Sequence, residues 1–311
     1  MKKKLCSQIA QIAAVIVMAV STTGFAAPVN TVNVYMSTND VPIEQSGNTS
    51  NISWEKGSNA SLEVVGFGTI PANTTNIAQA RALARRAAIV DGYRNLAEAI
   101  QGVQVDAETT MQNLVIANDT VKVKVSSLVQ GAKIIREIPQ ADGSYQIVMG
   151  IPLYGPSSLS SIALPAIQPE VIKVFPTPSV GYIEKTTETT SNQTIMGGYT
   201  GVIIDARGLG LESTFSPRVY DETGRIIYGN MYIDTDFAIS QGMVEYTTNL
   251  EMAQAAEAGQ SRAGLKPIVV KAIEVKENNC NVVISRVDAD MILARNNEFG
   301  FLKKCAVVFE R

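Results

Sequence analysis

The stretch Ile77–Gln101, IAQARALARRAAIVDGYRNLAEAIQ, decides the fold of the first half of the chain. Its apolar side chains recur at the spacing of one helix face, which predicts a helix over this stretch. Asn76, followed three residues later by Gln79, makes a capping-box-like start, and Gly102 is a natural stop. A stripe of small residues lets such a helix lie close on a sheet: Ala80, Ala84, Ala87 and Ala88.

The segments around this helix have the pattern of strands. Residues 61–70 read as one strand, and residues 103–107 can begin another. Residues 132–138 and 144–151 flank an Asp-Gly pair, which predicts a β-hairpin. Residues 119–130 stay ambiguous, because their valines alternate as in a strand and also fit one face of a helix.

Two irregular regions flank this unit. Residues 27–60 are rich in Asn, Ser and Thr and are predicted to be an irregular leader with one short strand at 31–35. Residues 154–196 contain several prolines and a polar tract at 185–192, which predicts a Pro-rich linker with at most one strand, near 171–175.

A second unit is predicted over residues 197–311, where apolar runs alternate with turn signals. The predicted strands are residues 200–206, 217–220, 225–228, 267–276, 281–287 and 305–310, and the predicted helices are residues 249–257 and 288–296. The sequence therefore predicts an α+β fold of two domains, residues 61–153 and 197–311, each a small mixed or antiparallel sheet packed by helices.

The first 26 residues have the order of a cleavable signal peptide. Lysines at positions 2–4 precede an apolar stretch at 12–20, which is too short to span a bilayer. Small residues place cleavage after Ala26, so Ala27 is the expected first residue of the mature chain. The alternative is a short membrane anchor or a buried helix. We expect export to the periplasm or secretion, with no transmembrane segment after cleavage.

The composition excludes several classes of chemistry. The chain has no histidine, which rules out Ser-His-Asp and Cys-His catalysis and argues against a conventional zinc site. The net charge is −3, and loss of the signal-peptide lysines makes it more acidic, so no general attraction to nucleic acid or anionic lipid is expected. We expect no cofactor, no metal and no enzymatic activity.

Two cysteines remain after signal cleavage. In an oxidising compartment, Cys280 and Cys305 are expected to form a disulfide. Such a bridge would close a loop of about 25 residues and would contribute about 3 kcal/mol to stability. The alternative is a pair of buried free thiols.

The helix region resembles a known bacterial domain, the twenty-kilodalton Lpp-type lipoprotein family. Three motifs carry the resemblance: Ala80-Arg81-x-x-Ala84, Asp91-x-Tyr93-Arg94-x-Leu96 and Ile100-x-Gly102-Val103. Residues 131–134 and 142–147 also resemble later strands of that domain. A similar domain opens the flagellar assembly protein FlgT. The chain lacks a lipobox, since Cys6 precedes the apolar stretch, so the resemblance implies an envelope protein without implying a lipid anchor.

The second unit resembles a segment that follows this domain in other exported bacterial proteins. The matching residues are 200–211 (TGVIIDARGLGL), 216–222 (SPRVYDE) and 227–229 (IYG). This resemblance implies no particular activity. A flagellar role is implied only by analogy with FlgT, because fold does not fix function.

Two groups of charged residues are candidate sites. Asp205 and Arg207 lie where a predicted strand ends, near Asp221 in the next hairpin, and could form a ligand loop. The alternative is a buried Asp-Arg pair that fixes the turn. On the long helix, Arg81, Arg85 and Arg94, with the neighbouring Arg86, could contact an acidic partner. The alternative is that these arginines are solvated or pair with residues such as Glu98.

Three further motifs are weak. Gly66-x-Gly68 and Gly208-x-Gly210 read as turns or bulges, because neither completes a phosphate-binding or dinucleotide motif. Ser53-x-x-Lys56 matches a serine-nucleophile motif but lacks its Lys-Thr-Gly partner.

Two aspartate pairs could supply oxygen ligands for calcium. These are Asp234 with Asp236 and Asp288 with Asp290. Neither pair lies in an EF-hand loop, so helix capping or a solvated turn is the alternative.

These observations favour an exported, non-enzymatic protein of the cell envelope with a binding or assembly role, comparable to a flagellar scaffold component. The expected partners are other envelope proteins, with self-association through an edge strand of the 132–151 hairpin as a further expectation. The alternative is a periplasmic ligand-binding protein or enzyme that uses residues 205–210.

Overall fold

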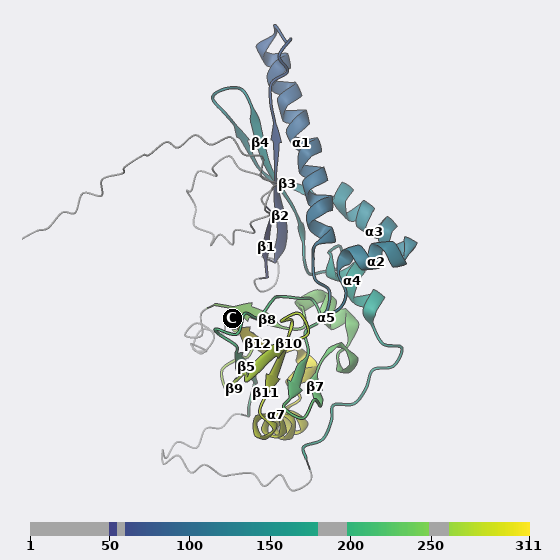
Figure 1. The fold of residues 1–311 in the computed structure, drawn as a ribbon, viewed down its shortest axis with the longest axis vertical. Helices are drawn as coiled ribbons and strands as arrows, with labels where there is room; N and C mark the ends of the chain where they lie inside the picture. The colour runs from purple at the N-terminus through teal and green to yellow at the C-terminus, as the bar shows by residue number, and fades with distance from the viewer. Residues whose placement is uncertain (1–49, 55–59, 180–197, 249–260) are drawn as a thin grey trace, which may run out of the picture. The chain divides into compact units, whose positions relative to one another are not determined.

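The computed structural model describes residues 50–54, 60–179, 198–248 and 261–311, which belong to one compact unit (Figure 1). The fold is mixed α+β, as predicted, and the described residues form three sheets of four strands each. Several predicted features lie outside the described residues: the signal peptide with Ala26 and Ala27, the strand at 31–35, the polar tract at 185–192 and the helix at 249–257. Among the described helices, none has the length and hydrophobicity needed to cross a membrane.

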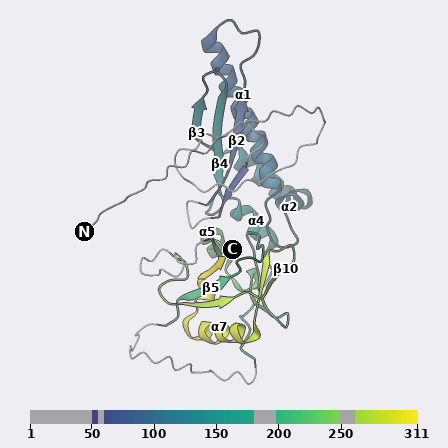
Figure 2. The ribbon, with the colours of Figure 1, turned by 60° about the vertical axis from the view of Figure 1, so that its left-hand side comes forward.

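The first segment, residues 50–152, contains one antiparallel sheet in the order β1-β2-β4-β3. Its strands are β1 (Ser50–Ser53), β2 (Ser61–Gly68), β3 (Lys133–Pro139) and β4 (Tyr145–Pro152). The predicted hairpin of β3 and β4 is present, and Gly143 adopts φ +84° in its turn, a conformation that favours glycine. Figure 2 shows β4 between β2 and the edge strand β3.

Helix α1 (Ile77–Gln101) has the predicted bounds and covers one face of this sheet, packing on β2 and β4 (Figure 1). Its first turn is capped by Asn76, whose side-chain oxygen accepts hydrogen bonds from two backbone N–H groups. Three residues of the small-residue stripe are buried, as predicted, whereas Ala87 is exposed. A Cβ on Gly66 would stand 2.2 Å from the backbone oxygen of Ala88, and one on Gly68 would stand 2.0 Å from that of Ala84. The helix and strand backbones therefore touch directly.

Side chains of α1 also close one edge of β2. The Phe67 N–H donates to Asp91 at 3.0 Å, and the Asn95 amide donates to the Val65 carbonyl at 2.8 Å. Strand β1 pairs with β2 only up to Ser50, which lies opposite Val64. The pairing of β1 with β2 therefore ends where side chains of α1 begin to bond to β2.

Two short helices follow α1. They are α2 (Met111–Ala117) and α3 (Asp119–Gln130), and the second resolves the ambiguous segment as a helix. The strand predicted at 103–107 is wrong, because this stretch makes only an isolated bridge between Gln104 and Thr110. The Asp106 carboxylate instead accepts the N–H groups of Glu108 and Thr109 and holds a tight turn.

Two regions predicted as irregular contain regular structure. The leader includes β1, which alternation could not reveal because its residues are mostly polar and half-buried. The linker includes α4 (Ser160–Ile167), which forms despite Pro165 because it buries Ile162 and Leu164. Residues 171–175 are not a strand.

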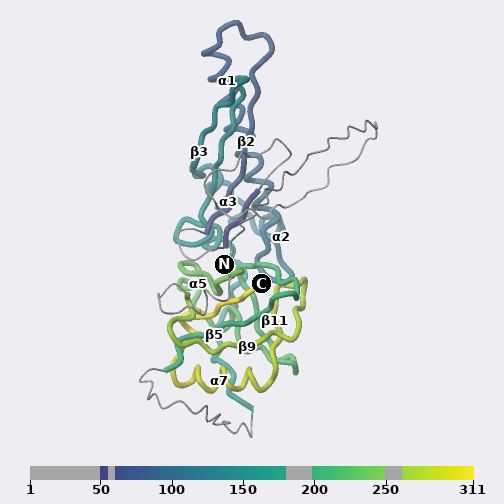
Figure 3. The backbone as a smooth tube through the Cα atoms, turned by 90° about the vertical axis from the view of Figure 1, so that its left-hand side faces the viewer, coloured from purple at the N-terminus to yellow at the C-terminus, as the bar shows by residue number. Residues whose placement is uncertain are grey.

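The second segment, residues 198–311, contains two sheets. One is entirely parallel in the order β8-β12-β5-β9, and the other is mixed in the order β10-β11-β6-β7. The strands are β5 (Gly201–Asp205), β6 (Val219–Asp221), β7 (Ile226–Tyr228), β8 (Glu245–Thr247), β9 (Pro267–Lys271), β10 (Glu274–Lys276), β11 (Asn281–Ile284) and β12 (Val307–Glu310). The helices among its described residues are α5 (Thr235–Gln241), α7 (Arg286–Phe299) and the single turns η2 (Asn230–Tyr232) and η4 (Leu302–Lys304). Figure 3 traces β5 beside β9.

Buried contacts join the two segments. Trp54 packs edge-on against Phe215 and Tyr246, with ring centroids 5.0 and 5.9 Å apart. The Ser216 N–H donates to the Val105 carbonyl at 2.9 Å. The prediction of two domains implies a core in each, but most buried apolar residues of both segments belong to one continuous cluster. A separate small cluster contains Ile203, Ala263 and Val308. The domain boundaries remain a prediction.

Candidate functional site

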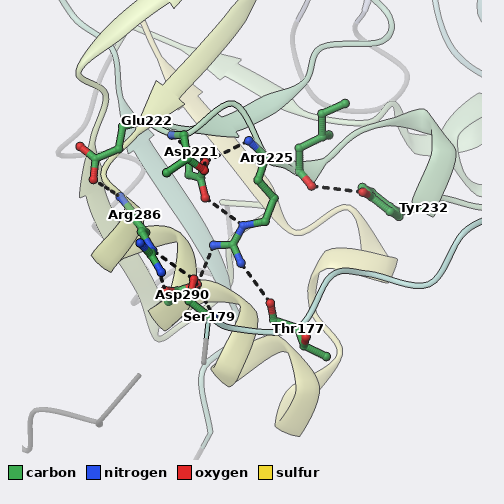
Figure 4. Close-up of polar contacts among 10 residues, drawn as sticks. Thr177, Ser179, Asp221, Glu222, Arg225, Tyr232, Arg286 and Asp290 are labelled. Carbon is green, nitrogen blue, oxygen red and sulfur yellow. Dashed lines mark hydrogen bonds and ion pairs between the residues drawn. The ribbon is translucent and has the colours of Figure 1, made fainter. Parts of the chain in front are cut away.

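A buried group of charged residues lies between the β6–β7 turn and helix α7. Arg225 is its centre: its Nε donates to Asp221 at 2.8 Å and its Nη2 donates to Asp290 at 2.6 Å (Figure 4). The side chains of Asp221 and Asp290 are 1% and 6% exposed, and that of Arg225 is 25% exposed. We call these three residues, with Ser179, the Arg225 cluster.

The Arg225 cluster fastens the connecting segment, residues 153–179, to α7. Arg225 Nη1 donates to the Thr177 carbonyl at 3.0 Å, and the backbone and hydroxyl of Ser179 both donate to Asp290 (Figure 4). Upstream in the same segment, Phe175 is buried and stacks on Tyr232 with ring centroids 4.9 Å apart. The cluster therefore acts as a structural clamp.

The chain supplies enough donors to keep both carboxylates ionised. Burial alone would raise the pKa of Asp221, but hydrogen bonds from Thr223 and Arg225 outweigh it and hold the pKa below its ordinary value. The pKa of Asp290 is lowered in the same way, because bonds from Arg225 and Ser179 exceed the effect of burial. Burial works against the charged form of Arg225, but the two carboxylates raise its pKa.

Only one member of the Arg225 cluster was predicted as a site residue. Asp221 was expected to join Asp205 and Arg207, but it lies at the end of β6, whereas Asp205 ends β5 in the other sheet. Arg225 was missed, although an Asp and an Arg separated by three turn residues are a recognisable signal. The second partner, Asp290, was considered only as a calcium ligand or cap.

The predicted pair of Asp205 and Arg207 is present. Arg207 Nε and Nη2 donate to the two carboxylate oxygens of Asp205 at 2.9 and 2.8 Å, and Nε also lies 3.4 Å from buried Glu310. Hydrogen bonding by Arg207 lowers the pKa of Asp205 despite partial burial. Gly208 and Gly210 both adopt positive φ in the following turn. Arg207 is exposed and Asp205 is half-buried, so the pair differs from the buried pair of the alternative interpretation. A ligand role for these residues stays a prediction.

The arginines of α1 divide into two kinds. Arg85 makes a bidentate pair with Glu137 of β3, at 2.9 and 2.6 Å, and this hydrogen bonding lowers the pKa of Glu137. Arg94 lies 3.7 Å from Asp91 and 3.6 Å from Glu98 on the same helix. Arg81 and Arg86 are exposed and form no ion pair with a described residue.

The predicted disulfide is wrong for this structure. Cys280 and Cys305 are both free and buried. Cys280 precedes β11 in the mixed sheet, whereas Cys305 precedes β12 in the parallel sheet. Their surroundings differ accordingly: Cys280 donates to the Asn278 carbonyl, and Cys305 lies beside Tyr228. Burial raises the pKa of each thiol to about 11.

The aspartates considered for calcium have structural roles here. Asp234 caps α5 by accepting two backbone N–H groups, and Ser285 caps α7 while bonding to Asp288. Within the described ranges, no group of three or more acidic or cysteine side chains could hold a metal ion. Ser53 lies in β1, and Lys56 is outside the described residues.

Two family models match the chain. Residues 53–151 match the LPP20 lipoprotein family, which confirms the predicted Lpp-type domain and indicates an envelope-associated protein. Residues 201–309 match the family described as Treponema pallidum Tp0624, second domain. No curated protein matched the chain. Neither family model is that of FlgT, so the flagellar similarity remains a prediction.

Proposed function

From the LPP20 lipoprotein domain at residues 53–151, we propose that this protein is an exported, non-enzymatic component of the bacterial cell envelope. It acts in the periplasm by binding another envelope protein through its first segment. The absence of histidine from the sequence and of any complete catalytic motif supports a binding role. An assembly role of the flagellar-scaffold kind is the form of this function that the FlgT resemblance favours.

The observation that carries the proposal is the free edge of β3. This strand pairs with β4 on one side, and no described strand pairs with its other side. Its residues are exposed apart from half-buried Ile138. An extended segment of another chain can add to such an edge through backbone hydrogen bonds.

The surroundings of this edge select the partner. Ile134 lies opposite Met149, whose side chain approaches Gly92 of α1, so Ile134 faces the helix side of the sheet. Arg85 is bound to Glu137 on that side, and Arg81 lies one helical turn away with no ion pair to a described residue. We therefore expect a partner strand with an acidic residue near Arg81.

Features of β3 oppose indiscriminate pairing. Its register shifts between Ile134 and Arg136, which marks a bulge, and the strand ends at Pro139. Bulges, charges and prolines on an edge strand reduce non-specific addition. If the β3 strands of two copies paired with each other about Arg136, the two Arg136 side chains would bring like charges together. A different protein is therefore favoured over a second copy of this chain.

The alternative ligand site at residues 205–210 has less support. The charge of Asp205 is already compensated by Arg207, and the two form a closed pair on one turn. A binding site for a small molecule usually needs several polar groups that converge on a pocket.

Site-specific photo-crosslinking in intact cells tests the proposal. A photoreactive residue at Ile134 should give a discrete adduct with an envelope protein. The same residue at Phe237 is the matched control, because both side chains are 37% exposed. Absence of an adduct at Ile134, or equal adducts at both positions, would refute docking at this edge. Turnover of a substrate by the purified protein would refute the non-enzymatic assignment.

A further inference from the structure

The first sheet has a second face, turned away from α1, which we call the outer face. Val65 pairs with Val148, and Phe67 pairs with Gln146, so these side chains share the outer face. Ile135 reaches it from β3, since its Cδ1 lies 3.0 Å from where a Cβ on Gly150 would stand. Phe67 and Ile135 are 37% and 51% exposed. Among the described helices, α1 is the one that packs extensively on this sheet, and it lies on the opposite face.

The geometry of β1 restricts the path of the chain that precedes it. Strand β1 begins at Ser50, opposite Val64 and halfway along β2. If the chain before Ser50 continued as a strand paired with β2, it would need the backbone groups of Val65 and Phe67 at this edge. Those groups are already bonded to Asn95 and Asp91. Because α1 fills the helix side of the sheet, the outer face is the side of the sheet that is still open to the preceding chain.

We propose that residues 32–49 of this same chain bind across the outer face. Val32, Val34 and Met36 alternate with other residues, in the pattern of a strand with one apolar side. The outer face offers apolar side chains to match. The residues between Met36 and Ser50 can span the sheet, since an extended chain advances about 3.3 Å per residue.

Cysteine pairing in the mature exported protein tests this inference. Val32, Val34 and Met36 are replaced by Cys one at a time, each together with Phe67→Cys. The control combines the same three substitutions with Leu83→Cys. Leu83 is 38% exposed, close to the 37% of Phe67, but belongs to α1. The native Cys280 and Cys305 are 1% and 0% exposed and do not interfere.

We expect mild oxidation to form an intramolecular bridge to Cys at position 67 in at least one pair, and no bridge to Cys at position 83. Equal bridging to both positions, or bridging to neither, would overturn the proposal. Disulfide-linked dimers would assign the outer face to a second copy and would overturn it as well.

A second measurement does not depend on the register of the segment. In Phe67→Cys alone, the thiol should be shielded from alkylation by residues 32–49. Adding Val34→Asp and Met36→Asp should raise the alkylation rate about tenfold, because the shielding segment then opens more often. An unchanged rate would contradict docking. Neither experiment depends on the partner-binding edge of β3, so the two proposals can fail separately.

Discussion

The Arg225 cluster of the second segment and the Arg85–Glu137 pair of the first use charged residues in opposite ways. In the second segment, Arg225 compensates two carboxylates that are nearly inaccessible to solvent. In the first segment, the Arg85–Glu137 pair is 42% and 32% exposed, and Arg81 has no ion pair with a described residue. Buried charges that satisfy one another hold a fold together, whereas exposed charges beside a free strand edge are available to a partner. This difference is our reason for proposing the partner site in the first segment.

The packing of the segments differs as well. Helix α1 meets its sheet backbone to backbone, through Gly66 and Gly68. The connecting segment is held to α7 by polar bonds from the Arg225 cluster. The first arrangement is sensitive to a single methyl group, and the second is sensitive to the loss of a single charge.

Removing the charge at the centre of the Arg225 cluster should have the largest effect. Arg225→Met leaves buried Asp221 without its cation and Asp290 with Arg286 alone, 3.9 Å away, and should lower the free energy of unfolding by about 3–5 kcal/mol. Urea unfolding followed by circular dichroism measures this loss. Arg85→Met is the matched control in the first segment, and its effect should be much smaller because that pair is solvated. Comparable losses in the two variants would contradict the contrast between the segments.

Adding a methyl group at the helix–strand contact should have the next largest effect. Gly66→Ala places a Cβ 2.2 Å from a backbone oxygen of α1, so the helix must shift. We expect a loss of about 1–3 kcal/mol in the free energy of unfolding, typical of overpacking. Gly102→Ala is the control, because its Cβ would find no atom closer than 3.6 Å. A neutral Gly66→Ala would show that α1 does not lie this close to β2.

The dependence of stability on pH should report on the Arg225 cluster. The pKa values of Asp221 and Asp290 are lowered in the folded protein. Their contribution to the free energy of unfolding is therefore complete above the unfolded-state pKa of about 4. It is lost as the pH falls through the pKa values of the folded state. Urea unfolding measured at intervals of about 0.5 pH between pH 7 and pH 2.5 should show this loss of stability in acid. The double variant Asp221→Asn, Asp290→Asn should show a flatter profile, and an unchanged profile would contradict the assignment.

The smallest expected signal concerns the two cysteines of the second segment. Burial raises the pKa of both thiols to about 11, and the thiolate is the reactive form. The native, unreduced protein should therefore resist alkylation at pH 8, and both thiols should react once it is unfolded. Failure of Cys280 and Cys305 to react in the unfolded, unreduced protein would restore the disulfide.

The sequence predicts α1 almost completely, because periodicity, the Asn76 cap and Gly102 all agree. The β3–β4 hairpin is equally well specified by its turn. Strand β1 could not be predicted from alternation, since its polar residues are held by pairing with β2 and not by burial. Helix α4 was missed because Pro165 argues against a helix locally, while burial of Ile162 and Leu164 favours one.

The candidate site was harder to predict than the fold. Contacts between neighbours, such as Asp205 with Arg207, follow from the order of residues. The Arg225 cluster joins residues up to 111 positions apart, such as Ser179 and Asp290, and only the folded arrangement reveals them. The same holds for the disulfide, since the sequence cannot show that Cys280 and Cys305 precede strands of different sheets.

The most direct test of the central claim compares one charge reversal in each segment. Arg81→Glu changes the side of α1 next to β3, and Lys271→Glu changes an exposed cation at the end of β9. We predict that Arg81→Glu lowers the yield of the Ile134 photo-adduct in cells by about tenfold, because it places a negative charge opposite an acidic partner strand. Lys271→Glu should leave that yield unchanged. Equal yields in both variants would contradict docking of an acidic partner at the β3 edge.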